Sequence, residues 1–266
     1  MRNFLLWLQF DGTDFCGWQQ QDGVRTVQGE LRAALHELTG VDVTLHSSSR
    51  TDAGVHALAM PVGFRLDTAL PLKAFRMGLN SLLPRDVRVL SAEDAPPGFH
   101  ARFSAAGKTY VYRIQVGRVA LPLERRTSWH IPMPLDVPAM GEAAKALVGR
   151  HDFSAFRAAH CDAASPVREM RRVEVAIERP GVVAIEVEAG GFLRNMVRVV
   201  VGTLVQVGLR RHPPSWVAEV LAGRDRSLAG QTAPPQGLFL KEVHYPDVIP
   251  DDPGPAPEPM VAEEDG

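Results

Sequence analysis

The order of apolar patterns along the chain limits its fold more than any other feature of the sequence. In the first hundred residues, strand-like apolar runs are separated by two segments whose apolar residues recur every three or four positions, as in helices. The expected elements are a strand at 3–10, a helix between Thr26 and Gly40, strands at 41–47 and 57–66, a helix at 72–83 and a strand at 87–92. Thr26 suits a helix N-cap and Gly40 suits a helix C-terminus. This strand-helix-strand-strand-helix-strand order is typical of a ferredoxin-like unit, in which helices cover one face of an antiparallel sheet.

The second half of the chain repeats this order more loosely. Its expected elements are strands at 108–116, 168–179, 182–189 and 238–244, and helices at 136–149, 192–208 and 214–222. A Pro-Pro-Gly stretch within 94–98 separates the halves, and 117–135, broken by three prolines, is expected to be a long loop. We therefore predict an α+β protein of two ferredoxin-like (βαββαβ) halves, residues 1–98 and 99–246, with mainly antiparallel sheets packed around a central cleft.

Charge is divided unevenly between the body of the chain and its end. Residues 247–266 contain seven acidic residues and no Lys or Arg, among several prolines, and this composition predicts a disordered tail. The whole chain has 29 basic and 31 acidic residues. Without the tail, the body therefore has a net charge of about +5, a modest surplus that weakly favours a polyanionic partner.

The cysteines and the first residues indicate where the protein resides. Cys16 and Cys161 lie far apart, and neither has a second Cys or a His at metal-ligand spacing. Reduced thiols in a cytoplasmic protein are therefore expected, without a zinc site. The apolar start breaks at Gln9 and Asp11 and lacks a small-residue cleavage site, so we expect no signal peptide and no membrane span.

Motifs for nucleotide, metal and serine-hydrolase chemistry are missing from the sequence. The run from Gly107 to Thr109 resembles the end of a phosphate-binding loop, but Arg102 stands where the earlier glycine would be needed. An alternating strand also follows where that motif requires a helix. There is no HExxH and no GxSxG, so we expect neither a metal nor any other cofactor.

One segment between two expected strands has the composition of a functional loop. Residues 46–56 place Arg50 and Asp52 among small side chains, which let a large ligand approach the backbone. Gly54 permits backbone conformations that other residues avoid. From these residues alone, Asp52 could be a nucleophile, a general base or a turn residue.

A resemblance to a known family favours the first of these roles. Residues 50–57, RTDAGVHA, resemble the active-site signature of the TruA family of tRNA pseudouridine synthases. The resemblance extends in order over residues 3–246. One further segment lies before the signature, FDGTDFCGWQ at 10–19, and four lie after it: FHARFS at 99–104, KTYVYR at 108–113, DFSAFR at 152–157 and FLRNMVR at 192–198. The chain departs from the family pattern at Ser49, where glycine is usual, and the acidic tail lies outside the resemblance.

The resemblance implies a role for each of four residues. Asp52 is the implied nucleophile, attacking ribose C1′ or uracil C6, and Arg198 is the cation that pairs with it. Tyr110 is expected to pack on the target base and to help remove the C5 proton, although an alternating strand could equally place it in the core. Arg50 is expected to fill the space of the extruded nucleotide or to bind its phosphate, the alternative being simple solvent exposure. Since Asp52 lies in the first half and two partners in the second, the active site is expected between the halves.

The resemblance also implies a substrate and an oligomeric state. Uridines 38, 39 and 40 of the tRNA anticodon stem-loop are the expected targets, modified by a homodimer on which one tRNA spans both subunits. Two rival functions remain from the sequence. A non-catalytic RNA-binding protein with ferredoxin-like sheets would not need Asp52, and a nucleoside or sugar hydrolase would release free uracil.

Overall fold

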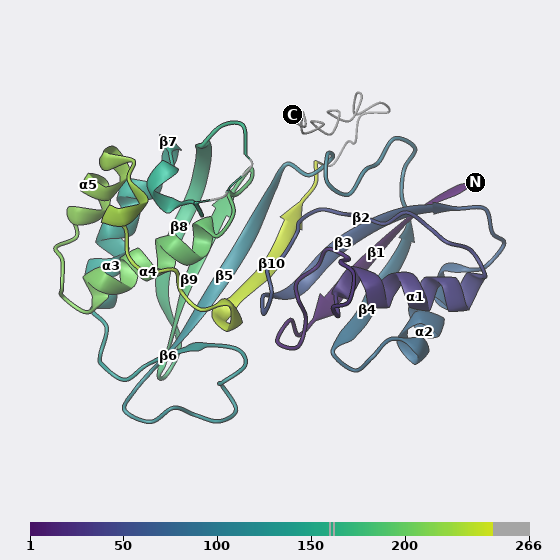
Figure 1. Ribbon diagram of the computed structural model, residues 1–266, viewed down its shortest axis with the longest axis horizontal. Helices are drawn as coiled ribbons and strands as arrows, with labels where there is room; N and C mark the ends of the chain where they lie inside the picture. Colours follow the sequence, from purple (N-terminus) through teal and green to yellow (C-terminus); the bar gives the residue numbers. More distant parts are fainter. Residues whose placement is uncertain (160, 162, 247–266) are drawn as a thin grey trace.

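The structure is a computed structural model that describes residues 1–159, 161 and 163–246. Figure 1 shows an elongated molecule in which strands run through the middle and helices gather in two groups, one towards each end. The strands are β1 (Arg2–Phe10), β2 (His46–Ser47), β3 (His56–Leu66), β4 (Val87–Asp94), β5 (Gly107–Val116), β6 (Trp129–Ile131), β7 (Gly149–Asp152), β8 (Val167–Arg179), β9 (Val182–Ala189) and β10 (Leu238–His244). The helices are α1 (Val27–Thr39), α2 (Leu72–Leu82), α3 (Val137–Ala144), α4 (Met196–Gly208) and α5 (Trp216–Gly223). Short 3-10 helices are η1 (Lys145–Leu147), η2 (Ser154–Phe156), η3 (Arg226–Leu228) and η4 (Pro235–Gly237).

The first half is an antiparallel sheet covered on one face by α1 and α2. Strand β1 lies between β4 and β3, and alternate residues of β1 face the helices. Phe4 of β1 lies 5.1 Å from Phe64 of β3 and 4.6 Å from Phe75 of α2, measured between ring centroids. The hydroxyl of Thr26 accepts the Gly29 N–H at the start of α1, as the sequence predicts, a contact worth about 1 kcal/mol.

The second half has its own antiparallel strands, β5, β9, β8 and β7 in that order. Helix α4 packs against α3, which contacts β8 of this sheet, and eleven of its thirteen residues are buried. Its sequence is apolar on nearly every side, which is typical of a helix enclosed by protein.

Strand β10 joins the two halves into one ten-stranded sheet. It pairs antiparallel with β5 over most of its length, and parallel with the start of β3 through Phe239 opposite His56 and Leu240 opposite Ala57. The predicted α+β class with a mainly antiparallel sheet is confirmed. The two expected sheets, however, meet edge to edge at this short parallel contact, so the start of β3 lies in the middle of the molecule (Figure 1).

Some predicted elements differ from the structure in length. The strand expected at 41–47 is reduced to β2, because Val43 and Leu45 are buried by side-chain packing while the backbone around them has no strand partner. The helix expected at 136–149 ends at Ala144 and is followed by η1 and the edge strand β7.

Two further differences concern loops. The helix expected at 192–208 begins only at Met196, because Asn195 has a left-handed backbone with φ of 61°. The long loop expected at 117–135 contains β6, which adds to β5 in parallel. The tail expected at 247–266 lies outside the described residues. Among the helices of the described ranges, none has the length and apolar composition needed to cross a bilayer.

Candidate active site

The loop that carries Asp52 connects β2 to β3 and is held by another loop, residues 11–18. The Trp18 N–H donates to the Thr51 carbonyl at 3.0 Å, and the Gly54 N–H donates to the Phe15 carbonyl at 3.3 Å. These bonds lie on both sides of Asp52. Because they use backbone groups, they fix the path of the loop independently of its side chains.

Glycines allow these two loops to come so close. A Cβ atom on Gly12 would lie 2.0 Å from the carbonyl oxygen of Val55, and one on Gly17 would lie 2.6 Å from that of Thr51. Gly17 and Gly54 also have positive φ angles, of 90° and 77°. The glycines of the segment 10–19 are therefore required by contact with the Asp52 loop.

His56 anchors the far end of this loop. The Gly12 N–H donates to its Nδ1 at 3.1 Å, its Nε2 lies 3.1 Å from the Gln236 carbonyl oxygen, and its ring stacks on Phe239 at 4.5 Å. Burial lowers the pKa of His56, although the neighbouring Asp11 carboxylate acts in the opposite direction. A neutral ring that accepts at Nδ1 and donates from Nε2 fits the contacts to Gly12 and Gln236. No role was expected for His56 from the sequence, although it belongs to the signature at 50–57.

The structure brings Asp52 and Arg198 together. The distance from Arg198 Nη1 to Asp52 Oδ2 is 3.8 Å, and the exposed fractions of the two side chains are 15% and 39%. This is an ion pair and too long for a hydrogen bond. The Arg198 guanidinium is held by bonds from Nε to the Ala233 carbonyl at 2.7 Å and from Nη1 to Asn195 Oδ1 at 3.1 Å. Burial lowers the pKa of Arg198, partly opposed by Asp52, but an arginine stays charged in proteins.

Tyr110 approaches the same loop from β5. Its hydroxyl lies 2.9 Å from the Ser49 hydroxyl, and its ring meets Phe192 edge to face at 5.2 Å. Burial raises the pKa of Tyr110 to about 12, and the charge of Asp52 adds to this effect. The phenol is therefore protonated at neutral pH. Ser49, the departure from the family pattern, is the residue that gives this phenol a hydrogen-bond partner.

Arg50 behaves differently from the other three predicted site residues. Its side chain is exposed and makes no hydrogen bond or ion pair with any residue that the structure describes. Arg50 and Asp52 are two positions apart on this loop but differ in environment: Asp52 forms an ion pair, whereas Arg50 is open to solvent.

The segment before β10 completes the site, although it was not expected there from the sequence. The Ala233 N–H donates to the Arg198 carbonyl at 3.0 Å, so this segment contacts both the backbone and the guanidinium of that residue. A Cβ on Gly54 would lie 2.8 Å from Pro235 Cγ, so the same segment also contacts the Asp52 loop. One sequence signal for this segment was available, since two adjacent prolines, at 234 and 235, lie shortly before the expected strand at 238–244.

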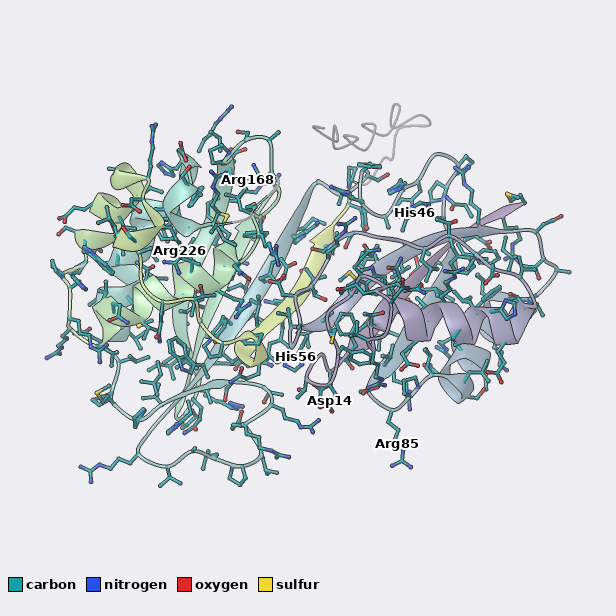
Figure 2. All side chains as sticks on the ribbon, viewed as in Figure 1. Asp14, His46, His56, Arg85, Arg168 and Arg226 are labelled. Carbon is teal, nitrogen blue, oxygen red and sulfur yellow. The ribbon has the colours of Figure 1, made fainter. Side chains whose placement is uncertain are left out.

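Lys108 also contacts the loop and was not assigned a role. Its ammonium donates to the Ser48 carbonyl, and burial together with the nearby Arg102 lowers the pKa of Lys108 to about 8. Figure 2 labels His56 close to the junction of the halves. Within the described residues, no group of three or more His, Cys, Asp or Glu side chains is arranged to hold a metal ion. The site thus offers a carboxylate paired with a cation, a buried phenol and a loop built from small residues.

One solved structure similar to the chain is described as "Structure of H/ACA RNP bound to a substrate RNA containing 2'-deoxyuridine". The similarity has a TM-score of 0.37 and 12% identity, covering 76% of this chain. The chain spans 44% of the length of that solved chain.

Sequence relatives are much more similar. The chain is 48% identical to tRNA pseudouridine synthase A of Myxococcus xanthus over 93% of each chain. It is 46% identical to tRNA pseudouridine synthase A of Geobacter sp. (strain M21), over 93% of this chain and 100% of the relative. A family model described as tRNA pseudouridine synthase matches residues 7–104 and 143–246. The chain therefore belongs to the tRNA pseudouridine synthase family.

Proposed function

We propose that this enzyme converts uridine to pseudouridine at positions 38, 39 and 40 of the tRNA anticodon stem-loop, with Asp52 as the nucleophile. The observation that carries the proposal is the ion pair between Asp52 and Arg198, which joins the two halves beside Tyr110. The relatives named tRNA pseudouridine synthase A align over nearly the whole chain, so the residues on both sides of this pair fall within the matched ranges.

The reaction rearranges bonds without a net change in oxidation. The bond from ribose C1′ to uracil N1 breaks, the base turns, and C1′ joins C5, while the proton lost from C5 balances the one gained at N1. The Asp52 carboxylate attacks either C1′ or C6, and both routes require an ionised nucleophile. Arg198 supplies the cation that stabilises this charge when a bound base excludes water. The reaction uses no cofactor and no metal.

Tyr110 and Arg50 are proposed to bind the substrate. Tyr110 keeps its proton at neutral pH, so its burial supports a role in packing against the target base rather than in removing a proton unaided. A stacked base is worth roughly 1 to 3 kcal/mol in comparable sites. Arg50 is exposed two residues before Asp52, a position suited to a phosphate or to the space that the extruded nucleotide leaves.

The reaction also limits how the RNA is recognised. A base that is attacked at C1′ or C6 must leave its stack, which costs least in a loop or at the end of a stem. Three adjacent target positions favour recognition of tRNA shape and phosphates over base identity. We further propose that the enzyme is a homodimer with halves at 1–98 and 99–246. We also propose that it is cytoplasmic, which its two free cysteines favour.

A single assay separates this function from its rivals. The intact protein is incubated with an unmodified tRNA transcript, and pseudouridine is mapped by its resistance to carbodiimide removal. We expect modification at positions 38 to 40 with no free uracil. Release of uracil would identify a hydrolase, and binding without product would identify a non-catalytic RNA-binding protein; either result would contradict the proposal.

A further inference from the structure

A second surface, formed by the sheet of the first half together with residues between 98 and 103, has the features of a ligand site. A groove of about 950 Å³ is lined by residues that include His46, Arg65, His100 and Phe103. It lies on the face of the sheet away from α1 and α2. A Cβ on Gly63 would lie 3.7 Å from Ala101, whereas the next residue, Phe64, packs against α2 on the other face. Figure 2 shows His46 well separated from His56 at the junction of the halves.

One wall of the groove is a row of aromatic rings. The ring of His46 lies 4.6 Å from that of His100, which lies 4.4 Å from that of Phe103. Phe103 is 38% exposed, so part of its ring is open to solvent. The Arg102 guanidinium lies 5.5 Å from the centre of the Phe103 ring. The row therefore presents flat rings and a cation to solvent.

Two arginines at the groove lack acidic partners: Arg65 lines it, and Arg102 lies beside it, between the lining residues Ala101 and Phe103. Arg65 and Arg102 are exposed, and neither guanidinium forms an ion pair or a hydrogen bond within residues 1–159, 161 and 163–246. The positive charges of Arg65 and Arg102 disfavour protonation of the neighbouring His100. Burial lowers the pKa of both His46 and His100, and Arg65 lowers both further.

Each of the two acids that also line the groove has a cationic neighbour. Asp42 lies 3.6 Å from Arg32 and 3.4 Å from His36, and Asp67 lies 3.5 Å from the amino group of Met1. The carboxylates of Asp42 and Asp67 therefore face cations of their own, whereas no acid that the structure describes pairs with Arg65 or Arg102. An anionic ligand would supply that missing partner.

We propose that this groove binds RNA, with Arg65 and Arg102 contacting phosphates and the rings of His100 and Phe103 stacking on a base. This inference rests on the proposed function and adds a second contact for the same substrate. Cations interleaved with exposed rings match a nucleic-acid strand, which carries both a charge and a flat base at each nucleotide. An acidic peptide would supply charge alone.

The groove is close enough to the active site to contact the same RNA. His46 lies six residues before Asp52, so their Cα atoms are at most about 20 Å apart even in an extended chain. A duplex covers that distance in roughly six base-pair steps. Lys108 lies between the two surfaces, bound to the Ser48 carbonyl and close enough to Arg102 for its pKa to be lowered.

The test compares RNA affinity with catalysis. Dissociation constants for an unmodified tRNA transcript are measured across a range of salt concentrations for the intact chain and for Arg65→Ala/Arg102→Ala. We expect the double variant to bind roughly tenfold more weakly. The slope of log Kd against log salt should fall by about 1.5, since two phosphate contacts are lost. The rate of a single turnover at saturating RNA should change much less than the affinity.

Two further variants serve as controls. Arg76→Ala removes an exposed arginine from α2, on the other face of the sheet, and should leave affinity and slope unchanged. Arg65→Lys/Arg102→Lys retains the charges and should retain most of the slope.

If the double alanine variant binds like Arg76→Ala, the proposal is wrong. It is equally wrong if that variant alters only the molecular mass of the protein in solution, since the face would then be a contact between copies. Affinity and product formation are measured separately, so either failure is distinct from failure to form pseudouridine.

Discussion

The two sides of the proposed active site are built in different ways. On the first-half side, Asp52 lies on an irregular loop whose path is fixed by backbone bonds to Phe15 and Trp18 and by the close approach of Gly12. On the second-half side, Arg198 lies in the first turn of a buried helix and is fixed by bonds from its own guanidinium. The position of Asp52 thus depends on backbone packing, whereas that of Arg198 depends on side-chain geometry. Different substitutions should therefore disrupt each side.

The largest effect is expected at Asp52, the proposed nucleophile. Asp52→Asn keeps the size of the side chain and removes the charge, so the covalent step is lost. We expect kcat to fall by at least about 10⁴-fold, as for other enzymes without their nucleophile. Pseudouridine formation on a tRNA transcript is measured under single-turnover conditions, with circular dichroism as the check on folding. A folded variant with more than a few per cent of the normal rate would exclude Asp52 as the nucleophile.

A smaller effect is expected on the second-half side. Arg198→Ala removes the cation beside Asp52, and we expect kcat to fall by about 10²- to 10³-fold with less change in KM, because the lost contact acts on charge at the reacting group. Arg198→Lys should recover only part of this loss, since an ammonium cannot bind the Ala233 carbonyl and Asn195 as the planar guanidinium does.

Arg211→Ala is the matched control for this side. Arg211 is exposed beyond the end of α4 and bonds only to Gln206 within the described residues, so its loss should leave kcat unaltered. Full activity in Arg198→Lys would show that charge alone matters. In that case the guanidinium bonds of Arg198 would not matter for its role, and the contrast with Asp52, which is fixed by backbone bonds, would no longer hold.

The sequence predicted the regular elements better than the contacts between them. Apolar periodicity located the helices and most strands because each pattern is local. The pairing of β10 with β3 involves only two residue pairs from segments some 180 positions apart, and such a contact leaves no pattern in either segment. The strand expected at 41–47 failed because burial of Val43 and Leu45 produces the same alternation as strand pairing.

The same limit applies to the site. The role of Asp52 was ambiguous from its own loop. Arg198 and Tyr110 were assigned to the same site through the resemblance alone, because no pattern in the residues of α4 or β5 indicates contact with a loop so distant in the chain. His56, Lys108 and the segment around Ala233 were missed for a related reason. Their roles consist of contacts with backbone carbonyls and N–H groups, which carry no residue-type signal.

The smallest of the three effects should arise where the first-half side depends on backbone packing. Gly12→Ala adds one methyl group, and its Cβ would lie 2.0 Å from the Val55 carbonyl oxygen, so one of the two loops must move. We expect the free energy of unfolding to fall by about 1 to 3 kcal/mol, as for other overpacked sites. We also expect kcat to fall by roughly tenfold, because Val55 lies three residues after Asp52.

Gly141→Ala provides the matched comparison, since a Cβ there meets nothing within 4 Å and the residue lies inside α3. That change should raise the free energy of unfolding by about 0.5 to 1 kcal/mol and leave kcat unaltered. Urea titration and single-turnover rates of both variants measure the two quantities separately. If Gly12→Ala lost stability with its rate intact, the loop around Asp52 would tolerate displacement. The precision of the site would then come from Arg198 and its helix alone.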